Sequence, residues 1–372
     1  MKIDPFGVEI WMNEWETKCE LNLAETCVES LTINDLLATI GQNEEDLSKI
    51  LPLKMTYGAI KGSERLRSSI CALYEEQGND NILVTNGTIG ANMLVYKTLV
   101  EPGDRVISLV PTYQQHYSIP ESIGADVDLL YLQEDLEWLP DLDLLKAKVL
   151  PGTKLIALTN PNNPTGALIS AESLEKIADI AGEVGAWILC DEVYRGTDQQ
   201  GNGKTKSIVD IYDKGISTAG MSKAFSLAGL RLGWIAGPEE LIEKVMIHRD
   251  YDTISVGMIN DHFATLALDN CDRLLERSQR ITRQNLDYLA QWMSSQPKLS
   301  WVKPKSGTTA LVKLAMDMSS LDFCIALLKK ESVMFTPGSA LGMEGYVRIG
   351  YANNPEILVN GLGRVSNFLS GL

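Results

Sequence analysis

The sequence predicts an α/β fold, with a large domain in which helices flank a mostly parallel sheet, joined to a smaller α+β domain. Three observations predict this class. The length of 372 residues suits about two domains. Up to about residue 238, short apolar runs alternate with amphipathic helical patterns, as in a parallel sheet with crossover helices. After residue 238, a long helical region is followed by a strand, a helix and a strand.

The strand predictions of the first part rest on apolar runs that are rich in β-branched residues and end at turn signals. Continuous apolar runs of this length suit strands that are buried on both faces of a sheet. The runs are DRVISLVP (104–111), TKLIALTNP (153–161), AWILCDE (186–192) and LGWIAGP (232–238).

Helical patterns lie between these strands. Residues 88–100 have apolar side chains at helical spacing. Residues 170–185 begin with Ser170, a suitable N-cap, and end at Gly185, a typical helix terminator.

We expect three parts along the chain. Residues 1–45 form an N-terminal segment that packs with the small domain or reaches a partner subunit. Residues 46–250 form the large domain, and residues 251–372 form the small domain, where TTALVKLAM, LDFCIALLKKES and YVRIGYAN read as strand, helix and strand.

Composition excludes several classes of function. The net charge is −16, with 33 basic and 49 acidic residues and no basic cluster, which argues against a nucleic-acid partner. No segment holds the roughly 18 apolar residues of a membrane span, and the N-terminus lacks the order of a signal peptide. We therefore expect a cytoplasmic protein without a membrane partner. Six scattered cysteines and three histidines predict no metal site.

Candidate site residues follow the predicted strands, since ligands of α/β sheets bind at the carboxyl ends of strands. In VTNGTIGAN (84–92), Gly87 opens a helix, and the backbone N–H groups of Thr88 and Ile89 are free to bind a phosphate. Taken alone, an ordinary helix start is the simpler interpretation of this stretch.

The next two candidates come from PTYQQHY and PNNPTG. Tyr113 could cover a flat ring, although a packing tyrosine is the simpler interpretation. Asn163 precedes Pro164, which favours an extended backbone and aims the amide out of the turn. A plain Asn-Pro turn is the alternative.

Three further candidates carry charge or a phenol. Asp191 ends an apolar strand, where a carboxylate is costly unless it is paired, and it could hold a protonated ring nitrogen. A strand-end acid that faces water is the alternative. Tyr194 could offer its hydroxyl to a phenolate. Lys223 lies in a run of small residues, GISTAGMSKAFSLAGLRLGW (215–234), which is typical of a covalent cofactor site.

Together these residues indicate one ligand, pyridoxal 5′-phosphate. The helix start would take its phosphate, and Tyr113 would cover its ring. Asp191 would pair with the pyridine nitrogen, and Asn163 and Tyr194 would hold the phenolic oxygen. Lys223 would form the Schiff base and later move the α-proton. Because a surround of small apolar residues disfavours charge, we expect a lowered pKa for Lys223.

The chain also resembles fold type I pyridoxal phosphate enzymes of the class I/II aminotransferase group, from about residue 56 to residue 352. The resemblance is carried by YGAIKGSERLR, NGTIGAN, PTY, NPNNPTG, DEVY, GMSKAFSLAGLRLGW and YVRIGYA, in this order.

The resemblance implies further site residues. Tyr57 matches a tyrosine that reaches the phosphate of the neighbouring subunit's cofactor, which implies a homodimer with shared active sites. Arg231 matches a phosphate-binding arginine, and Arg348 matches the arginine that binds the substrate α-carboxylate. One position departs from the pattern: Gly220 replaces a phosphate-binding serine, for which Ser222 could compensate.

The function that this implies is amino-group transfer between an amino acid and a 2-oxo acid. A lyase, cyclase or oxidase would use the same residues. The segments LNLAETCVES and LKMTYGAIKGSERLR resemble pyridoxal phosphate enzymes that act on arginine-like substrates. A cofactor-sensing domain of a transcription regulator is disfavoured, because the region before Tyr57 is too short for a winged helix and the chain is acidic.

Two smaller features are given structural roles. The histidines, among them His116, have no catalytic spacing. Trp11 and Trp15 lie four residues apart, as on one helix face, and packing is the favoured interpretation, with pocket lining as the alternative.

Overall fold

A seven-stranded sheet forms the centre of the larger unit. The computed structural model describes residues 2–372, apart from the side chain of Asp46. The strands are β2 (Ile82–Thr85), β3 (Arg105–Val110), β4 (Asp126–Tyr131), β5 (Thr153–Thr159), β6 (Trp187–Asp191), β7 (Gly215–Gly220) and β8 (Gly233–Ala236). They are ordered β2-β8-β7-β6-β5-β3-β4 across the sheet. The four runs predicted from sequence correspond to β3, β5, β6 and β8.

The sheet is mostly parallel, which confirms the predicted fold class. Strand β8 runs antiparallel to β2 and β7, and the other pairs are parallel. Residues 221–232 connect β7 to β8 without an α-helix to cross the sheet, so β8 returns beside β7 in the opposite direction.

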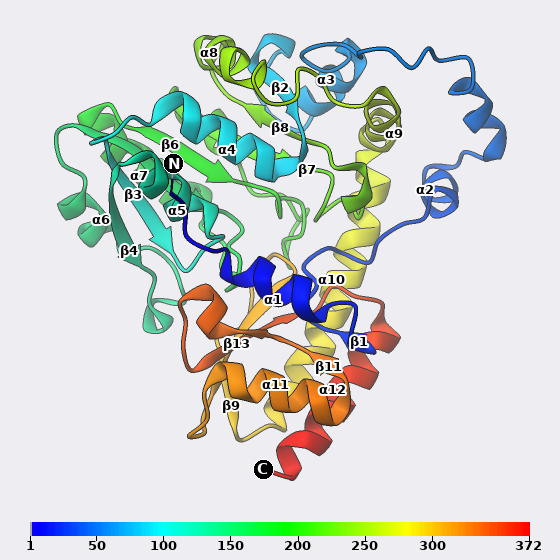
Figure 1. Cartoon of the computed structure of the whole chain (residues 1–372), viewed down its shortest axis with the longest axis vertical. Coiled ribbons are helices and arrows are strands. Elements are labelled where there is room, and N and C mark those ends of the chain that lie inside the picture. Colours follow the sequence, from blue (N-terminus) through cyan, green and yellow to red (C-terminus); the bar gives the residue numbers. More distant parts are fainter. Residues whose placement is uncertain (1) are drawn as a thin grey trace.

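Helices cover both faces of this sheet (Figure 1). Along β6, Ile188 and Cys190 point into one apolar cluster and Leu189 into another, so alternate residues serve opposite faces. The first cluster includes α6 (Leu142–Lys148) and α7 (Ala171–Val184), and the second includes α4 (Gly87–Leu99), α5 (Gln115–Ile123) and α8 (Glu239–Arg249). Helix α7 begins at the predicted cap, where Ser170 accepts the N–H of Ser173, and ends before Gly185, whose φ is 71°.

A third apolar cluster lies beside β2 and β8. It includes α2 (Ile33–Ile40), α3 (Glu64–Cys71), α9 (Met258–Leu268) and the start of α10 (Cys271–Ser294). The long helical region read from the sequence is therefore three helices, α8 to α10. Residues 250–257, DYDTISVG, are rich in turn formers and separate the first two, and Ile254 there has a φ of 55°.

The smaller unit is built on a four-stranded antiparallel sheet of order β12-β13-β10-β9. Its strands are β9 (Leu299–Trp301), β10 (Thr309–Leu314), β12 (Thr336–Pro337) and β13 (Tyr346–Gly350). Its core also takes side chains from α10, α11 (Ser320–Glu331) and α12 (Pro355–Ser370). Helix α10, yellow in Figure 1, runs from the larger unit into the smaller one.

The N-terminal segment joins the smaller unit. Strand β1 (Leu21–Asn22) pairs in parallel with β11 (Val333–Met334), and α1 (Gly7–Trp15) contacts β12 and the short helix η6 (Gly338–Leu341). In Figure 1, α1 (dark blue) lies between the large sheet and the smaller unit. The boundary at residue 250 stays a prediction, and the packing puts α9 and the start of α10 with the larger unit.

Within residues 2–372, no helix combines the length and the apolar character that crossing a membrane requires. The same residues hold no cluster of three or more His, Cys, Asp or Glu side chains arranged for a metal ion.

Candidate active site

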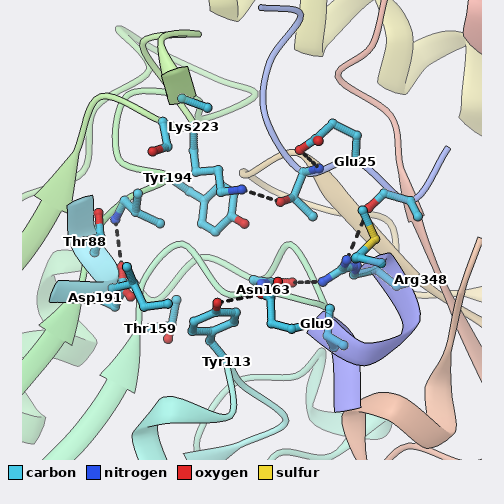
Figure 2. Close-up of a pocket in the computed structure, with 18 of the residues that line it drawn as sticks. Glu9, Glu25, Thr88, Tyr113, Thr159, Asn163, Asp191, Tyr194, Lys223 and Arg348 are labelled. Atoms are coloured by element: carbon cyan, nitrogen blue, oxygen red, sulfur yellow. Dashed lines mark hydrogen bonds between the residues drawn. The ribbon is translucent and has the colours of Figure 1, made fainter. Parts of the chain in front are cut away.

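A cavity of about 550 Å³ lies at the carboxyl ends of β5, β6 and β7. One wall, called here the sheet wall, contains Thr88, Asn92 and Asp191. The opposite wall, called the outer wall, contains Glu9 from α1, Glu25 and Arg348 from β13. Figure 2 shows the two walls facing each other across Tyr194 and Asn163.

Most residues predicted from sequence come together in this cavity. The predicted residues that line it are Thr88, Ile89, Tyr113, Asn163, Asp191, Tyr194, Ser222, Lys223, Arg231 and Arg348. Gly87 begins α4 beside it. Tyr57 does not line the cavity of its own chain, and it is 75% exposed. Its proposed role requires a second subunit, so it stays a prediction.

The N-terminus of α4 has the groups that bind an anion. The Thr88 Oγ1 atom is buried and has no hydrogen-bond partner. Gly87 has a φ of 68°, and a Cβ there would lie 3.1 Å from Nη2 of Arg231, so the guanidinium lies directly against the helix start. A free hydroxyl, unpaired N–H groups and a cation together suit a phosphate.

The position of Gly220 explains why the serine of the family pattern is missing. A Cβ at Gly220 would lie 2.7 Å from Thr88 Oγ1 and 3.0 Å from the carbonyl oxygen of Leu232. Gly220 pairs with Gly233 across β7 and β8, and a Cβ at Gly233 would lie 2.5 Å from the backbone nitrogen of Thr88. The two glycines let the start of α4 approach the sheet, and the Thr88 hydroxyl occupies the space that a serine side chain would need.

Asp191 is a buried carboxylate, 4% exposed, with several polar neighbours. Its Oδ2 accepts a hydrogen bond from Asn92 Nδ2 at 2.9 Å and lies 3.5 Å from His116 Nε2, and its Oδ1 accepts from the N–H of Val193. The hydroxyl of Tyr96 lies 2.9 Å from His116 Nδ1 on the far side of the ring. These contacts fix the carboxylate at the end of β6, where it can hold a protonated ring nitrogen.

Arg348 is the buried cation of the outer wall, 3% exposed. It donates from Nη1 to Oδ1 of Asn163 at 3.2 Å and from Nη2 to Ala24 O and Thr336 Oγ1, while its Nε has no partner. Within the described residues, no carboxylate lies within 4 Å of the guanidinium. Burial lowers the pKa of Arg348, and Glu25 and Glu9 act against that shift. An anionic ligand group would complete its contacts.

Lys223 has a higher pKa than we expected from the sequence. Its Nζ donates to Thr26 Oγ1 at 2.6 Å and lies 3.4 Å from Sγ of Cys27. Burial alone lowers the Lys223 pKa, but Cys27, Tyr194 and Glu25 outweigh it and the net pKa is raised. Burial also raises the pKa of Cys27 to about 11 and raises that of Tyr194, so Glu25 is the neighbour that carries the charge at neutral pH.

Sequence reasoning missed several polar residues of the cavity. Asn92 lies four residues after Thr88, so helical spacing alone would have placed both on one face of α4. His116 does not line the cavity itself, but it lies three residues after Tyr113 and is buried beside Asp191. Glu9 and Glu25 had no local signal, because they reach the cavity through the packing of the N-terminal segment on the smaller unit.

The two tryptophans of α1 pack as we expected. Trp11 is buried in the core of the smaller unit and donates from Nε1 to the carbonyl oxygen of Phe335, and Trp15 packs against the same core. Neither lines the cavity. The other face of the same helix does so, with Glu9, Met12 and Asn13.

Comparison with known proteins identifies the family. The model of aminotransferase class I and II matches residues 33–362. The chain belongs to this family. Its cofactor is therefore pyridoxal 5′-phosphate, and the free hydroxyl of Thr88, the cation of Arg231 and the buried carboxylate of Asp191 fit the phosphate and ring of that molecule.

Individual members of the family are similar over the whole chain. A solved pyridoxal-phosphate-dependent aminotransferase from Streptococcus suis 89-1591 is 43% identical with a TM-score of 0.97, covering 100% of this chain and 99% of that one. The solved pyridoxal-phosphate-dependent cyclase OrfR is 25% identical with a TM-score of 0.92, covering 100% and 98%. Capreomycidine synthase from Streptomyces vinaceus is 26% identical over 367 residues, which cover 97% of this chain and 93% of that protein.

Proposed function

We propose that this protein transfers an amino group between an amino acid and a 2-oxo acid, with its cofactor bonded to Lys223. The observation that carries the proposal is the convergence of Lys223, Asp191 and Arg348 on one cavity. When bound, pyridoxal phosphate supplies a carbonyl carbon that bonds an amine and a ring that accepts the electrons of the substrate α-carbon.

The sheet wall holds and polarises the cofactor. Asp191 keeps the proton on the ring nitrogen, because a buried carboxylate held by Asn92 favours a cation beside it. Thr88 and Arg231 bind the phosphate group. Asn163 accepts from Arg348 through its Oδ1, so its Nδ2 is free to donate, together with the Tyr194 hydroxyl, to the phenolic oxygen.

The outer wall orients the substrate. The guanidinium of Arg348 binds the α-carboxylate, and its bonds to Asn163, Ala24 and Thr336 fix its direction. The Lys223 amine takes the α-proton and can return it at another carbon, a step worth about 10²–10⁴-fold in rate. The Thr26 hydroxyl, 2.6 Å from Nζ, holds the amine on the side of the cavity where the α-carbon would lie.

The homodimer with shared active sites is part of this proposal. Tyr57 and Ile89 are 75% and 41% exposed, and the adjacent Leu51 and Met55 are exposed as well. Exposed apolar side chains of this kind favour an interface. Sedimentation analysis of wild type and Tyr57→Phe, with cofactor titration of both, tests it: a monomeric wild type would contradict the shared site.

The proposed reaction is tested by absorbance of the purified protein with added pyridoxal phosphate. We expect a band near the visible edge that Lys223→Ala abolishes. Addition of a suitable amino acid should convert the cofactor to its amine form with release of the 2-oxo acid, and a second 2-oxo acid should restore the band. A wild-type protein that forms no such band, or a Lys223→Ala variant that retains it, would refute the assignment.

A second candidate is a cyclase or lyase that acts on an amino acid, including an arginine-like one. The similarity over the whole chain to capreomycidine synthase and to the cyclase OrfR favours it. The same residues would remove the α-proton, and the fate of the electrons would differ. Product analysis distinguishes the candidates. A product that keeps its amino nitrogen but loses water or another leaving group indicates cyclisation, and a 2-oxo acid released together with ammonia indicates elimination. A 2-oxo acid released without ammonia, with the nitrogen left on the cofactor, indicates transfer.

A further inference from the structure

The outer wall carries more negative charge than the proposed chemistry uses. Three carboxylates line it: Glu9, Glu16 and Glu25. Glu16 lies at the exposed rim, whereas Glu9 and Glu25 are partly buried. Within the described residues, none of the three has a cationic partner within 4 Å.

The other charges of the cavity already have a use. Lys223 bonds the cofactor, Arg231 faces the phosphate, and Asp191 faces the ring nitrogen. The α-carboxylate of a substrate neutralises Arg348. With these four charges balanced, Glu9 and Glu25 remain as a net negative charge beside the space where the side chain of the substrate must lie.

Glu9 is held in place by the residue that would cover the cofactor ring. Its Oε1 accepts a hydrogen bond from the Tyr113 hydroxyl at 2.8 Å. On the opposite face of α1, Trp11 is buried in the core of the smaller unit, so the helix cannot rotate Glu9 away from the cavity without exposing that side chain. Figure 2 shows Glu9 beside Arg348 and Tyr113.

Glu25 is held by the backbone that follows it. Its Oε1 accepts the N–H groups of Thr26 at 2.6 Å and Cys27 at 2.8 Å. Burial opposes its ionisation, but the Lys223 ammonium and these N–H groups lower its pKa below the ordinary value. When Lys223 bonds the cofactor, the two N–H groups still donate to Glu25 and favour its charged form, and the carboxylate is then free to bind another cation.

Arg348 gives independent evidence for the orientation of a ligand. Its Nε is buried without a partner in a side chain that is 3% exposed. An anionic group of a ligand would complete the contacts of this guanidinium, and Glu9 and Glu25 line the same side of the cavity (Figure 2). A ligand that satisfies this wall has an anion at one end and a cation at the other.

We propose that the outer wall selects α-amino acids with a cationic side chain, an ammonium or a guanidinium, held by Glu9 and Glu25 while Arg348 binds the α-carboxylate. This rests on the proposed function and specifies its substrate class. Dicarboxylic amino acids are rejected, because a second carboxylate would lie beside two like charges in a partly desolvated site.

A binding experiment tests the proposal without any turnover. Calorimetry of the holoenzyme would use 5-guanidinopentanoate, which has the carboxylate and guanidinium of arginine but no α-amino group. The neutral 5-ureidopentanoate and the dianion glutarate are the comparison ligands. We expect the guanidino acid to bind on the order of tenfold or more tightly than the ureido acid, and glutarate to bind weakest.

Variants test whether the two carboxylates cause the preference for the guanidino acid over the ureido acid. Glu9→Gln and Glu25→Gln keep side-chain size and should each reduce the guanidino-to-ureido ratio on the order of tenfold. Glu14→Gln is the matched control, since Glu14 is exposed on α1 and pairs with Lys18 outside the cavity. Equal binding of the two ligands by wild type, or a ratio that neither cavity variant changes, would overturn the proposal.

A kinetic experiment separates this inference from the proposed function. The rate of cofactor conversion would be compared for arginine and citrulline, for lysine and norleucine, and for glutamate. Faster reaction of the cationic member of each pair supports the inference. A holoenzyme that converts glutamate or the neutral amino acids best would refute the substrate class and leave amino-group transfer standing. A holoenzyme that converts no amino acid of any class would refute the proposed function instead.

Discussion

The two walls of the cavity differ in how they are built. The sheet wall consists of buried side chains: Asp191 is 4% exposed and accepts from Asn92, which in turn accepts from Thr218, and the Thr88 hydroxyl is buried as well. The outer wall consists of partly exposed carboxylates on a helix and a loop, with Arg348 as its buried cation. A rigid wall suits a cofactor that stays bound, and an exposed one suits a substrate that must enter and leave.

This difference indicates that the sheet wall determines cofactor binding and that the outer wall determines which substrate is selected. Side chains of the sheet wall come from the end of β6 and from the first turns of α4, which packs against the same sheet, so their relative positions are fixed by that packing. Those of the outer wall come from α1, from residues 24–26 and from β13, which meet through the smaller unit. Changes in the sheet wall should therefore affect every amino acid equally, and changes in Glu9 or Glu25 of the outer wall should depend on the side chain of the substrate.

The largest effect is expected for Asp191→Asn. The amide cannot supply the negative charge that holds a proton on the ring nitrogen, so the rate of cofactor conversion should fall on the order of 10²–10³-fold for all amino acids tested. Rapid-mixing absorbance measures it. Asp126→Asn, at a side chain that is 71% exposed, is the control. A loss of rate that differed strongly between substrates would contradict the division of roles between the two walls.

Arg348→Lys should have the next largest effect. Lysine cannot reproduce the fork that bonds Asn163, Ala24 and Thr336, so kcat/KM should fall by about 10²-fold for all α-amino acids. Cofactor affinity should stay within about twofold of wild type, because Arg348 lies on the other wall. The surface pair of Arg364 with Glu20 provides the control, Arg364→Lys. A large loss of cofactor affinity in Arg348→Lys would contradict this separation.

Much of the sheet wall could be predicted from the sequence. Thr88, Asp191 and Lys223 each lie within a few residues of a strand end, where a short pattern places them. On the outer wall, Arg348 could be predicted from the resemblance of YVRIGYA, but Glu9 and Glu25 could not be predicted. The N-terminal segment that carries these two joins the smaller unit through the pairing of two-residue strands, Leu21–Asn22 with Val333–Met334, which no local pattern marks.

The pKa of Lys223 shows what is missed when the residues of the outer wall are not predicted. The small residues around Lys223 predicted a lowered pKa, and burial does act in that direction. Cys27, Tyr194 and Glu25 together reverse the sign, and two of these three lie almost two hundred residues earlier in the chain. Local sequence describes the desolvation of a group, whereas its charged neighbours are set by tertiary contacts.

A smaller effect tests the packing of the sheet wall. Gly220→Ser introduces a Cβ 2.7 Å from Thr88 Oγ1, so the helix start must shift. We expect the cofactor dissociation constant to rise about tenfold and the free energy of unfolding to fall by about 1–3 kcal/mol. In Gly229→Ser, the control, a Cβ meets no atom within 4 Å. Tighter cofactor binding in Gly220→Ser would show that the serine of the family pattern can be accommodated after all.

The smallest effect concerns the outer wall and pH. The pKa of Glu25 is lowered from 4.5 on folding, so its charge stabilises the protein above that pH, and this contribution is lost as the pH falls through its folded-state pKa. Glu25→Gln should lower the free energy of unfolding by up to about 1 kcal/mol at pH 7, and the difference should shrink on acidification below about pH 4.5. Urea unfolding of the cofactor-free protein measures it. A difference that grows in acid would contradict the sign.

The two faces of α1 have an evolutionary consequence. Trp11 and Trp15 anchor the helix on the smaller unit, while Glu9, Asn13 and Glu16 line the cavity at helical spacing. Mutations on the second face leave the anchor and the catalytic residues unchanged, so new substrate preferences can arise there at little cost in stability. A directed-evolution library limited to these three positions would therefore explore specificity while most of its members still fold.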